Sequence, residues 1–88
     1  MKAKEGYMLK EVAGTNVIVP VADLDFDGII TLNGTGTLVW KTLEGGATEE
    51  EIISAVMNEY DVERDVVQKD VELFLDALRK AELLDDEG

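Results

Sequence analysis

The chain has 88 residues, with 20 acidic and 8 basic side chains, no histidine, no cysteine and a formal charge of −12. One small domain with a single modest core is expected at this length, and the missing residue types exclude disulfides, the usual zinc and iron–sulfur sites, and thiol or imidazole catalysis. The negative charge argues against nucleic acid and anionic membranes as partners, because both require a basic surface.

The first third of the chain is predicted to form strands. Residues 6–12 and 17–22 are rich in apolar and β-branched residues, and the turn-forming sequence Gly14-Thr15-Asn16 lies between them. This pattern predicts a β-hairpin. A second turn signal at Asp27-Gly28 precedes residues 29–32, which predict a short third strand.

The segment Asp23-Leu24-Asp25-Phe26-Asp27-Gly28 matches the first half of a calcium-binding EF-hand loop. Such a loop requires a bidentate glutamate at its twelfth position, where this chain has Gly34. Leu24 and Phe26 are also apolar, unlike the residues of a solvated loop. We expect a turn between strands, with weak cation binding as the alternative.

Three helices are expected in about residues 34–84. Asn33 is a suitable N-cap for the first, which Gly45-Gly46 would end. Thr48 and Glu51 fit a capping box that opens the second helix, whose apolar face is expected to contain Ile52, Ile53, Val56, Met57 and Tyr60. The third and longest helix is predicted from about Arg64 to Leu83.

The third helix has apolar residues over about half of its circumference, more than the roughly 100° stripe that a surface helix needs. One strip, which Leu75 adjoins, consists of Val67, Val71, Phe74, Leu78 and Ala81. A second, adjacent strip consists of Val66, Leu73, Ala77 and Leu84. Either a small domain buries both strips, or one packs on the core while the other lines an open groove. Asp70 falls between the two strips.

Few residues suggest catalysis. Ser54 is the only serine, lies in a predicted helix and has no histidine to activate it. The carboxylate runs 49–51 and 85–87 are typical of helix starts and solvated tails rather than of acid–base pairs, and no phosphate-binding lysine follows Gly34-Thr35-Gly36. We therefore expect no enzymatic activity, no cofactor and no metal.

The order of elements predicts an α+β fold, a winged helix-turn-helix-like arrangement of a three-stranded antiparallel N-terminal sheet followed by three helices. DNA binding is the least expected function of such a fold here, because the third helix has five acidic and four basic residues and no basic stripe. The single tryptophan, Trp40, is expected to anchor the core, with an interface role as the alternative.

The segment Ile30-Thr31-Leu32-Asn33-Gly34-Thr35-Gly36, followed by Val39-Trp40 and Leu43-Glu44-Gly45, resembles the LNxTGxxxW…L.G hallmark of the PqqD-like family. The resemblance continues through the helical half and covers about residues 6–84, with the quoted positions Thr48–Ile52, Tyr60–Val62, Asp70-Val71, Phe74-Leu75, Leu78 and Leu83-Leu84. It implies one peptide-binding domain over residues 1–88, with strands in about 6–32.

The resemblance also implies a function, that of a non-enzymatic adaptor that binds the leader of a ribosomally made precursor peptide. Such proteins present the leader to a modifying enzyme, often a radical S-adenosylmethionine enzyme, with the peptide added as a strand to the third strand and lying against the third helix. The peptide-binding residues expected on this basis are Asp27, Gly28, Ile29, Ile30, Thr31, Leu32, Val66, Val67, Asp70, Leu73, Phe74 and Ala77.

Charge suggests how such a leader would be recognised. Asp70 would pair with a basic leader residue or a peptide N–H. The alternative is a local partner on the protein, such as Arg64 or Lys69. The acidic segment 23–27 is not part of the family motif, and we take it as favouring a leader that contains lysine or arginine. Residues 44–88 carry fifteen acidic and four basic side chains, mostly at helix starts and the tail, away from this groove.

Two other functions are compatible with the sequence. The chain is alternatively a structural or regulatory interaction domain that binds no leader, or, less favoured, a DNA-binding winged helix. Either a monomer or a dimer is compatible with the sequence, because an open edge strand invites self-pairing. No signal-peptide core or membrane span is visible, so the cytoplasm is the expected compartment.

Overall fold

Three strands form an antiparallel sheet in the order β2-β3-β4 in the computed structural model, which describes residues 1–22 and 30–85. The strands are β2 (Tyr7–Val12), β3 (Thr15–Pro20) and β4 (Ile30–Leu32). Ile18 of β3 lies opposite Ile30 of β4 in the register. Because β3 is central, β4 is an edge strand of the described sheet.

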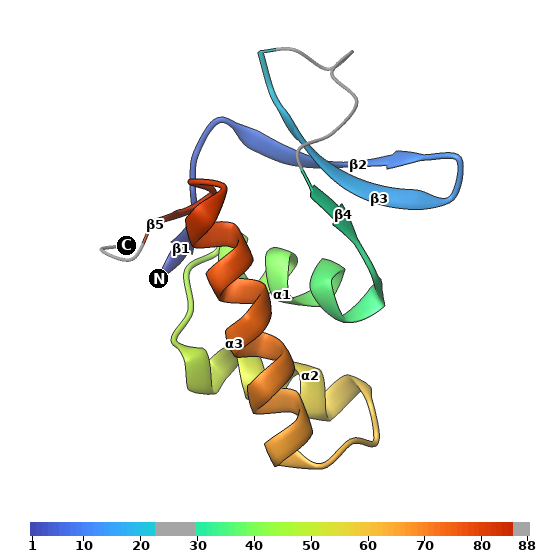
Figure 1. Ribbon diagram of the computed structural model, residues 1–88, viewed down its shortest axis with the longest axis vertical. Coiled ribbons are helices and arrows are strands. Elements are labelled where there is room, and N and C mark those ends of the chain that lie inside the picture. The colour runs from blue at the N-terminus through green and yellow to red at the C-terminus, as the bar shows by residue number, and fades with distance from the viewer. Residues whose placement is uncertain (23–29, 86–88) are drawn as a thin grey trace.

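Three helices follow the sheet, namely α1 (Gly34–Glu44), α2 (Glu49–Glu59) and α3 (Arg64–Lys80). The sheet lies at one end of the helical group, and the long axis of α3 extends from the α2–α3 connection toward the sheet (Figure 1). The expected α+β fold, with an antiparallel three-stranded sheet followed by three helices, is confirmed.

The predicted position of the hairpin turn was wrong. The loop consists of Ala13 and Gly14, both with positive φ (52° and 82°), and Val12 pairs with Thr15. Positive φ at both central residues is typical of a type I′ turn, whose twist matches that of the two paired strands. Thr15 and Asn16 therefore belong to β3, which ends at Pro20 rather than at residue 22.

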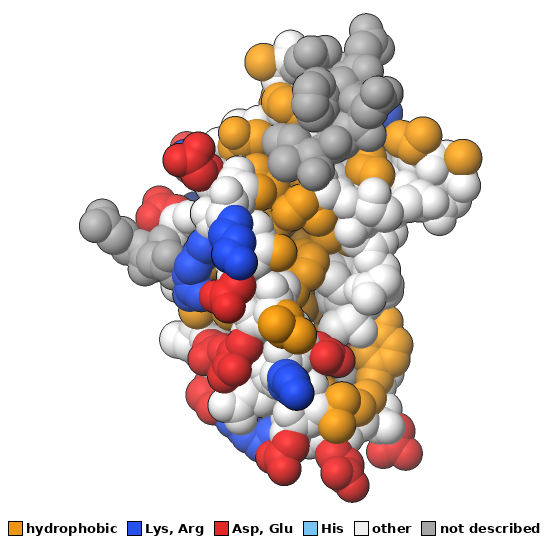
Figure 2. All heavy atoms as spheres, in the orientation of Figure 1, with side chains coloured by type: hydrophobic (Ala, Val, Ile, Leu, Met, Phe, Trp, Pro, Cys, Tyr) orange, Lys and Arg blue, Asp and Glu red, His pale blue; other side chains and the backbone are white. Residues whose placement is uncertain are grey.

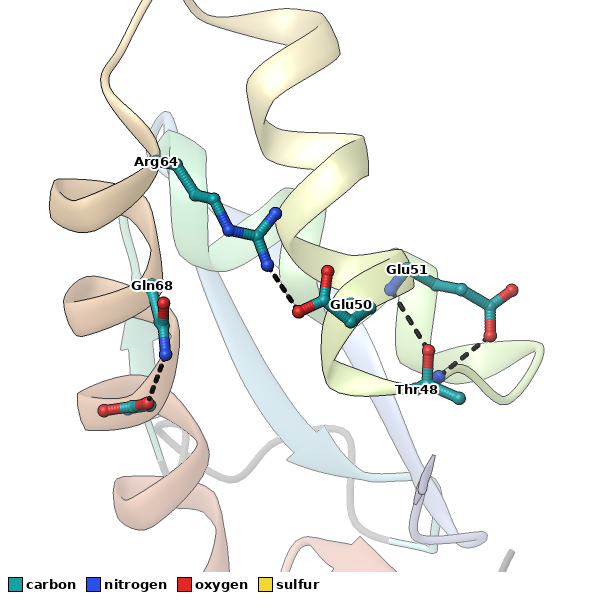
Figure 3. Close-up of polar contacts among 6 residues, drawn as sticks. Thr48, Glu50, Glu51, Arg64 and Gln68 are labelled. Carbon is teal, nitrogen blue, oxygen red and sulfur yellow. Dashed lines mark hydrogen bonds and ion pairs between the residues drawn. The ribbon is translucent and has the colours of Figure 1, made fainter.

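The predicted helix starts are confirmed. The Asn33 side chain accepts a hydrogen bond from the Gly36 N–H at 2.7 Å. The Thr48 hydroxyl accepts from the Glu51 N–H at 3.1 Å, and the Glu51 carboxylate accepts from the Thr48 N–H at 3.0 Å, which completes the capping box (Figure 3). Gly46 has φ of 82° just after α1, where a glycine was expected to end the helix.

The third helix ends three residues before its predicted end. Glu82 has φ of 59°, and the N–H groups of Glu82 and Leu83 donate to the carbonyls of Arg79 and Leu78. This pair of hydrogen bonds is a Schellman motif, and it accompanies a contact between apolar residues on either side of the helix end. Leu83 is fully buried in this position, beyond the helix rather than on it.

A second, two-stranded sheet joins the chain ends and was not predicted. It pairs β1 (Lys2–Ala3) with β5 (Leu84–Asp85). The Lys4 N–H also donates to the Leu83 carbonyl at 2.9 Å, and the Met1 N-terminus donates to the Ala47 carbonyl at 3.0 Å. Two-residue strands carry no periodicity, so only tertiary contacts reveal them.

The core lies between the sheet and the three helices. Trp40 of α1 is fully buried, as predicted for a core anchor. The α2 residues Ile52, Ile53 and Val56 are also buried, whereas Met57 and Tyr60, which the periodicity placed on the same face, are each 38% exposed. None of the helices in residues 1–22 and 30–85 is long and apolar enough to span a membrane.

The capping box predicts how stability depends on pH. The hydrogen bond from the Thr48 N–H lowers the pKa of Glu51, so the ionised carboxylate stabilises the fold above its unfolded pKa, and this contribution is lost as the pH falls through the folded pKa. We expect the free-energy difference between the wild type and Glu51→Gln to be constant near neutral pH and to shrink in acid. Urea unfolding at several pH values measures the free energy of unfolding of both variants. A difference between them that stays the same from neutral to acid pH would contradict the prediction.

Candidate functional site

An open groove of about 370 Å³ lies between the start of α1 and the middle of α3. Its lining consists of Asn33, Thr35, Gly36, Asp70, Leu73, Phe74 and Ala77. Hydrophobic side chains are visible in the hollow between α3 and the segment formed by β4 and the start of α1 (Figure 2). We call this feature the α1–α3 groove.

Hydrogen bonds hold the α1 side of the groove in place. Besides its capping bond, Asn33 accepts through its backbone carbonyl from the Thr37 hydroxyl at 2.9 Å. The Asn16 side-chain amide donates to the Thr37 hydroxyl at 3.2 Å, which connects β3 with the first turn of α1. The cap that starts the helix therefore also fixes one wall of the groove relative to the sheet.

Close packing between Gly36 and Phe74 brings the two walls together. A Cβ atom on Gly36 would lie 2.9 Å from Cε2 of Phe74, closer than such atoms approach. Only glycine therefore allows the first turn of α1 to lie against this ring. Phe74 is half-buried: it packs against the core and also lines the groove.

The two faces of α3 have different environments. Val67, Val71, Leu75 and Leu78 are buried, with exposed fractions of 2% or less. Leu73 is 62% exposed and Val66 is 49% exposed, although both are large apolar residues. Of the two alternatives for this helix, the structure has the one in which a strip packs on the core and the adjacent strip is open.

The edge of β4 leads directly into the groove, because Leu32 ends the strand and Asn33 begins the groove lining. Leu32 is buried, Ile30 is half-buried and Thr31 is exposed, the alternation of a strand with one face on a core. An edge strand presents backbone N–H and C=O groups to which another extended chain can pair. The arrangement therefore combines a pairing edge with a groove whose α3 wall is mostly apolar.

The structure brings four of the predicted site residues together in this groove, namely Asp70, Leu73, Phe74 and Ala77. Ile30 and Thr31 lie at the adjoining edge, with Leu32 beneath it, and Val66 is exposed outside the groove lining. Val67, also predicted for the site, lies in the core instead, because it is on the buried face of α3. Asp27, Gly28 and Ile29, with the rest of the acidic segment 23–27, fall outside the described residues.

Three groove residues were missed as site residues, namely Asn33, Thr35 and Gly36. The sequence assigns Asn33 to a helix cap and to the family hallmark, but not to the peptide-binding site. The signal for all three was their position in the LNxTG hallmark, since a capping asparagine followed by closely spaced glycines places bare backbone at the start of a helix.

Asp70 is the only charged residue among the described residues that line the groove. The expected alternative, a local pair with Arg64 or Lys69, is absent from the described part of the chain. Arg64 instead forms an ion pair with Glu50 of α2 (Figure 3), and that hydrogen bond raises the pKa of Arg64. The carboxylate of Asp70 has no hydrogen bond or ion pair within residues 1–22 and 30–85 and is exposed.

The packing of Gly36 leads to a testable prediction. Glycine-to-alanine changes inside helices usually stabilise by about 0.5–1 kcal/mol, but Gly36→Ala is expected to destabilise by about 1 kcal/mol or more, because its Cβ displaces the Phe74 ring. Gly45→Ala is the matched control, since nothing lies within 4 Å and its φ is −91°. Urea unfolding and the NMR signals of the Phe74 ring measure both, and equal behaviour of the two variants would contradict the packing argument.

Comparisons with known proteins agree with this architecture. The family model described as "Coenzyme PQQ synthesis protein D (PqqD)" matches residues 21–84. The chain is also similar to a solved structure described as "TbiB1 in Complex with the TbiA(beta) Leader Peptide", with 31% sequence identity and a TM-score of 0.76 over 98% of this chain and 96% of that one. No significant match was found among curated proteins.

Proposed function

The chain belongs to the PqqD family, and from this we propose that it is an adaptor that binds the leader segment of a ribosomally made precursor peptide and presents it to a modifying enzyme. The leader would add as a strand to the edge of β4 and place side chains in the α1–α3 groove. The observation that carries this proposal is that β4 is an edge strand of the described sheet and leads directly into a groove with apolar side chains on its α3 wall.

The edge of β4 and the α1–α3 groove would contribute differently to binding. Backbone pairing along β4 gives affinity without sequence preference, and pockets for alternate side chains give selectivity. The β4 strand has only three residues, so pairing along it is short. Burial of peptide side chains against Leu73, Phe74 and Ala77 would supply the remaining affinity through the hydrophobic effect.

Similarity to the TbiB1 structure supports the same proposal, because that protein was solved with a leader peptide and shares the fold over nearly its whole length. We extend the proposal to residues 1–88 as one peptide-binding domain. We assign the chemical step to a partner, for which a radical S-adenosylmethionine enzyme is our first candidate, and we place the adaptor in the cytoplasm, where precursor peptides are made.

An interaction domain that binds no leader is the alternative from another class. It would use the same exposed apolar strip on α3 to dock a folded partner, but it would not need the open edge of β4. The two functions therefore differ in whether backbone pairing contributes to binding.

NMR titration of the full-length labelled protein with peptides from neighbouring short open reading frames tests the proposal. We expect shifts at residues 30–36 and along the exposed strip of α3. Backbone N-methylation of the bound peptide at alternate positions then tests strand pairing: one set of positions should abolish binding and the other should be tolerated. Shifts elsewhere, no binding by any leader, or indifference to N-methylation would overturn the proposal.

A further inference from the structure

We propose that Asp70 makes the groove selective for a peptide that carries a lysine or arginine two residues from the apolar side chain seated against Phe74. This inference rests on the proposed function and adds the chemistry of the ligand to it. Asp70 would act as a specificity-determining residue, while the apolar anchor and the strand edge supply the general affinity.

The spacing follows from the geometry of helix and strand. Asp70 and Phe74 are four residues apart on α3, so they are separated along the helix axis by about 6 Å. Side chains on the same face of an extended peptide recur every second residue, at intervals of about 6.6–6.8 Å. A peptide strand that runs along α3 and places one side chain beside Phe74, Leu73 and Ala77 therefore places its next same-face side chain near Asp70.

The charge follows from the surroundings of Asp70. Among the described residues that line the groove it is the only charged one, and the others are apolar or neutral polar groups. Its carboxylate has no partner among the described residues, since Arg64 is engaged by Glu50. An unpaired anion favours a cation at that position and disfavours an acidic side chain, so Asp70 both attracts one class of peptide and repels the other.

A randomised peptide library selected against the immobilised full-length protein tests this inference. Wild type, Asp70→Asn, Asp70→Lys and Asp76→Asn serve as baits. Asp76 is the matched control, because it lies on the same helix outside the groove lining and the substitution changes the net charge equally. Affinities are then measured for synthetic peptide pairs that carry either lysine or methionine at the position two residues from the apolar anchor.

For the wild type and Asp76→Asn, we expect enrichment of lysine or arginine at that position and an affinity about two- to fivefold higher for the lysine peptide, the range of an exposed ion pair. Asp70→Asn should bind both peptides equally, and Asp70→Lys should enrich aspartate or glutamate there. High salt should remove the lysine preference of the wild type.

The outcomes separate the two proposals. Equal affinity of the wild type for the lysine and methionine peptides, no enrichment of basic residues at that position, or a lysine preference that survives in Asp70→Asn would overturn the role of Asp70 and leave the proposed function intact. A library from which no peptide is enriched would overturn the proposed function, and the role of Asp70 with it.

Discussion

Replacing Leu73 by glutamine is expected to weaken binding of a leader peptide roughly 10- to 100-fold, because about 1.5–3 kcal/mol is gained by burying a leucine side chain. Leu73 lines the α1–α3 groove and is 62% exposed in the free protein. Its apolar surface is thus available to a ligand and is not already used by the core. Isothermal titration calorimetry with any peptide that shifts the groove signals measures the effect.

The same substitution should leave the fold nearly as stable as before. Glutamine has almost the helix propensity of leucine, and an exposed side chain contributes little to the free energy of unfolding. Met57→Gln is the matched control, because Met57 is a 38% exposed apolar residue on α2, outside the groove lining. An unchanged dissociation constant for Leu73→Gln, or an equal loss for Met57→Gln, would show that the groove does not bind the peptide.

The second large effect concerns the core. Trp40→Ala is expected to lower the free energy of unfolding by about 3–5 kcal/mol, through lost burial and the cavity that remains. That is a large part of the roughly 5–15 kcal/mol that stabilises most domains. Trp40 is fully buried in the cluster that joins α1 with β1, β3, α2 and α3, so no neighbouring element can close the cavity alone. Circular dichroism during urea unfolding measures the loss without relying on the tryptophan itself.

Trp40→Phe is the control for this prediction. The indole Nε1 is buried and has no hydrogen-bond partner in the described structure. Phenylalanine retains an aromatic ring and removes that unpaired donor, so we expect a loss smaller than that of alanine, near 1.5 kcal/mol or below. Equal losses in the two variants would contradict the view that Trp40 acts through packing.

Both helix caps were predictable from short stretches of sequence. Asn33 bonds to an amide three residues away, and so do Thr48 and Glu51. Interactions of such short range depend on local residue types and backbone angles. For the same reason the order of the three-stranded sheet and the three helices, and with it the fold class, followed from turn signals and periodicity.

The errors occurred where a distant contact outweighed a local preference. The sequence Gly14-Thr15-Asn16 favours a turn, but register with β4 places Asn16 opposite Leu32. Helical periodicity continued through Leu83, but α3 ends at Lys80, and the buried Leu83 accepts a hydrogen bond from the N–H of the distant Lys4. The β1–β5 pair joins the two chain ends and has no local signal at all.

For the groove, the amino-acid sequence by itself determined that α3 has two apolar strips with Asp70 between them. It also determined that Asn33 caps a helix directly after a short strand. It left open which strip is buried, because an isolated helix presents both equally.

Only the tertiary structure decided that Val67 lies in the core, that Leu73 is open to solvent, and that Gly36 contacts Phe74. The physical reason is that burial depends on which elements surround a helix, and these are set by packing of α1, α2 and the sheet. Periodicity identifies residues able to be buried, but it does not specify what covers them.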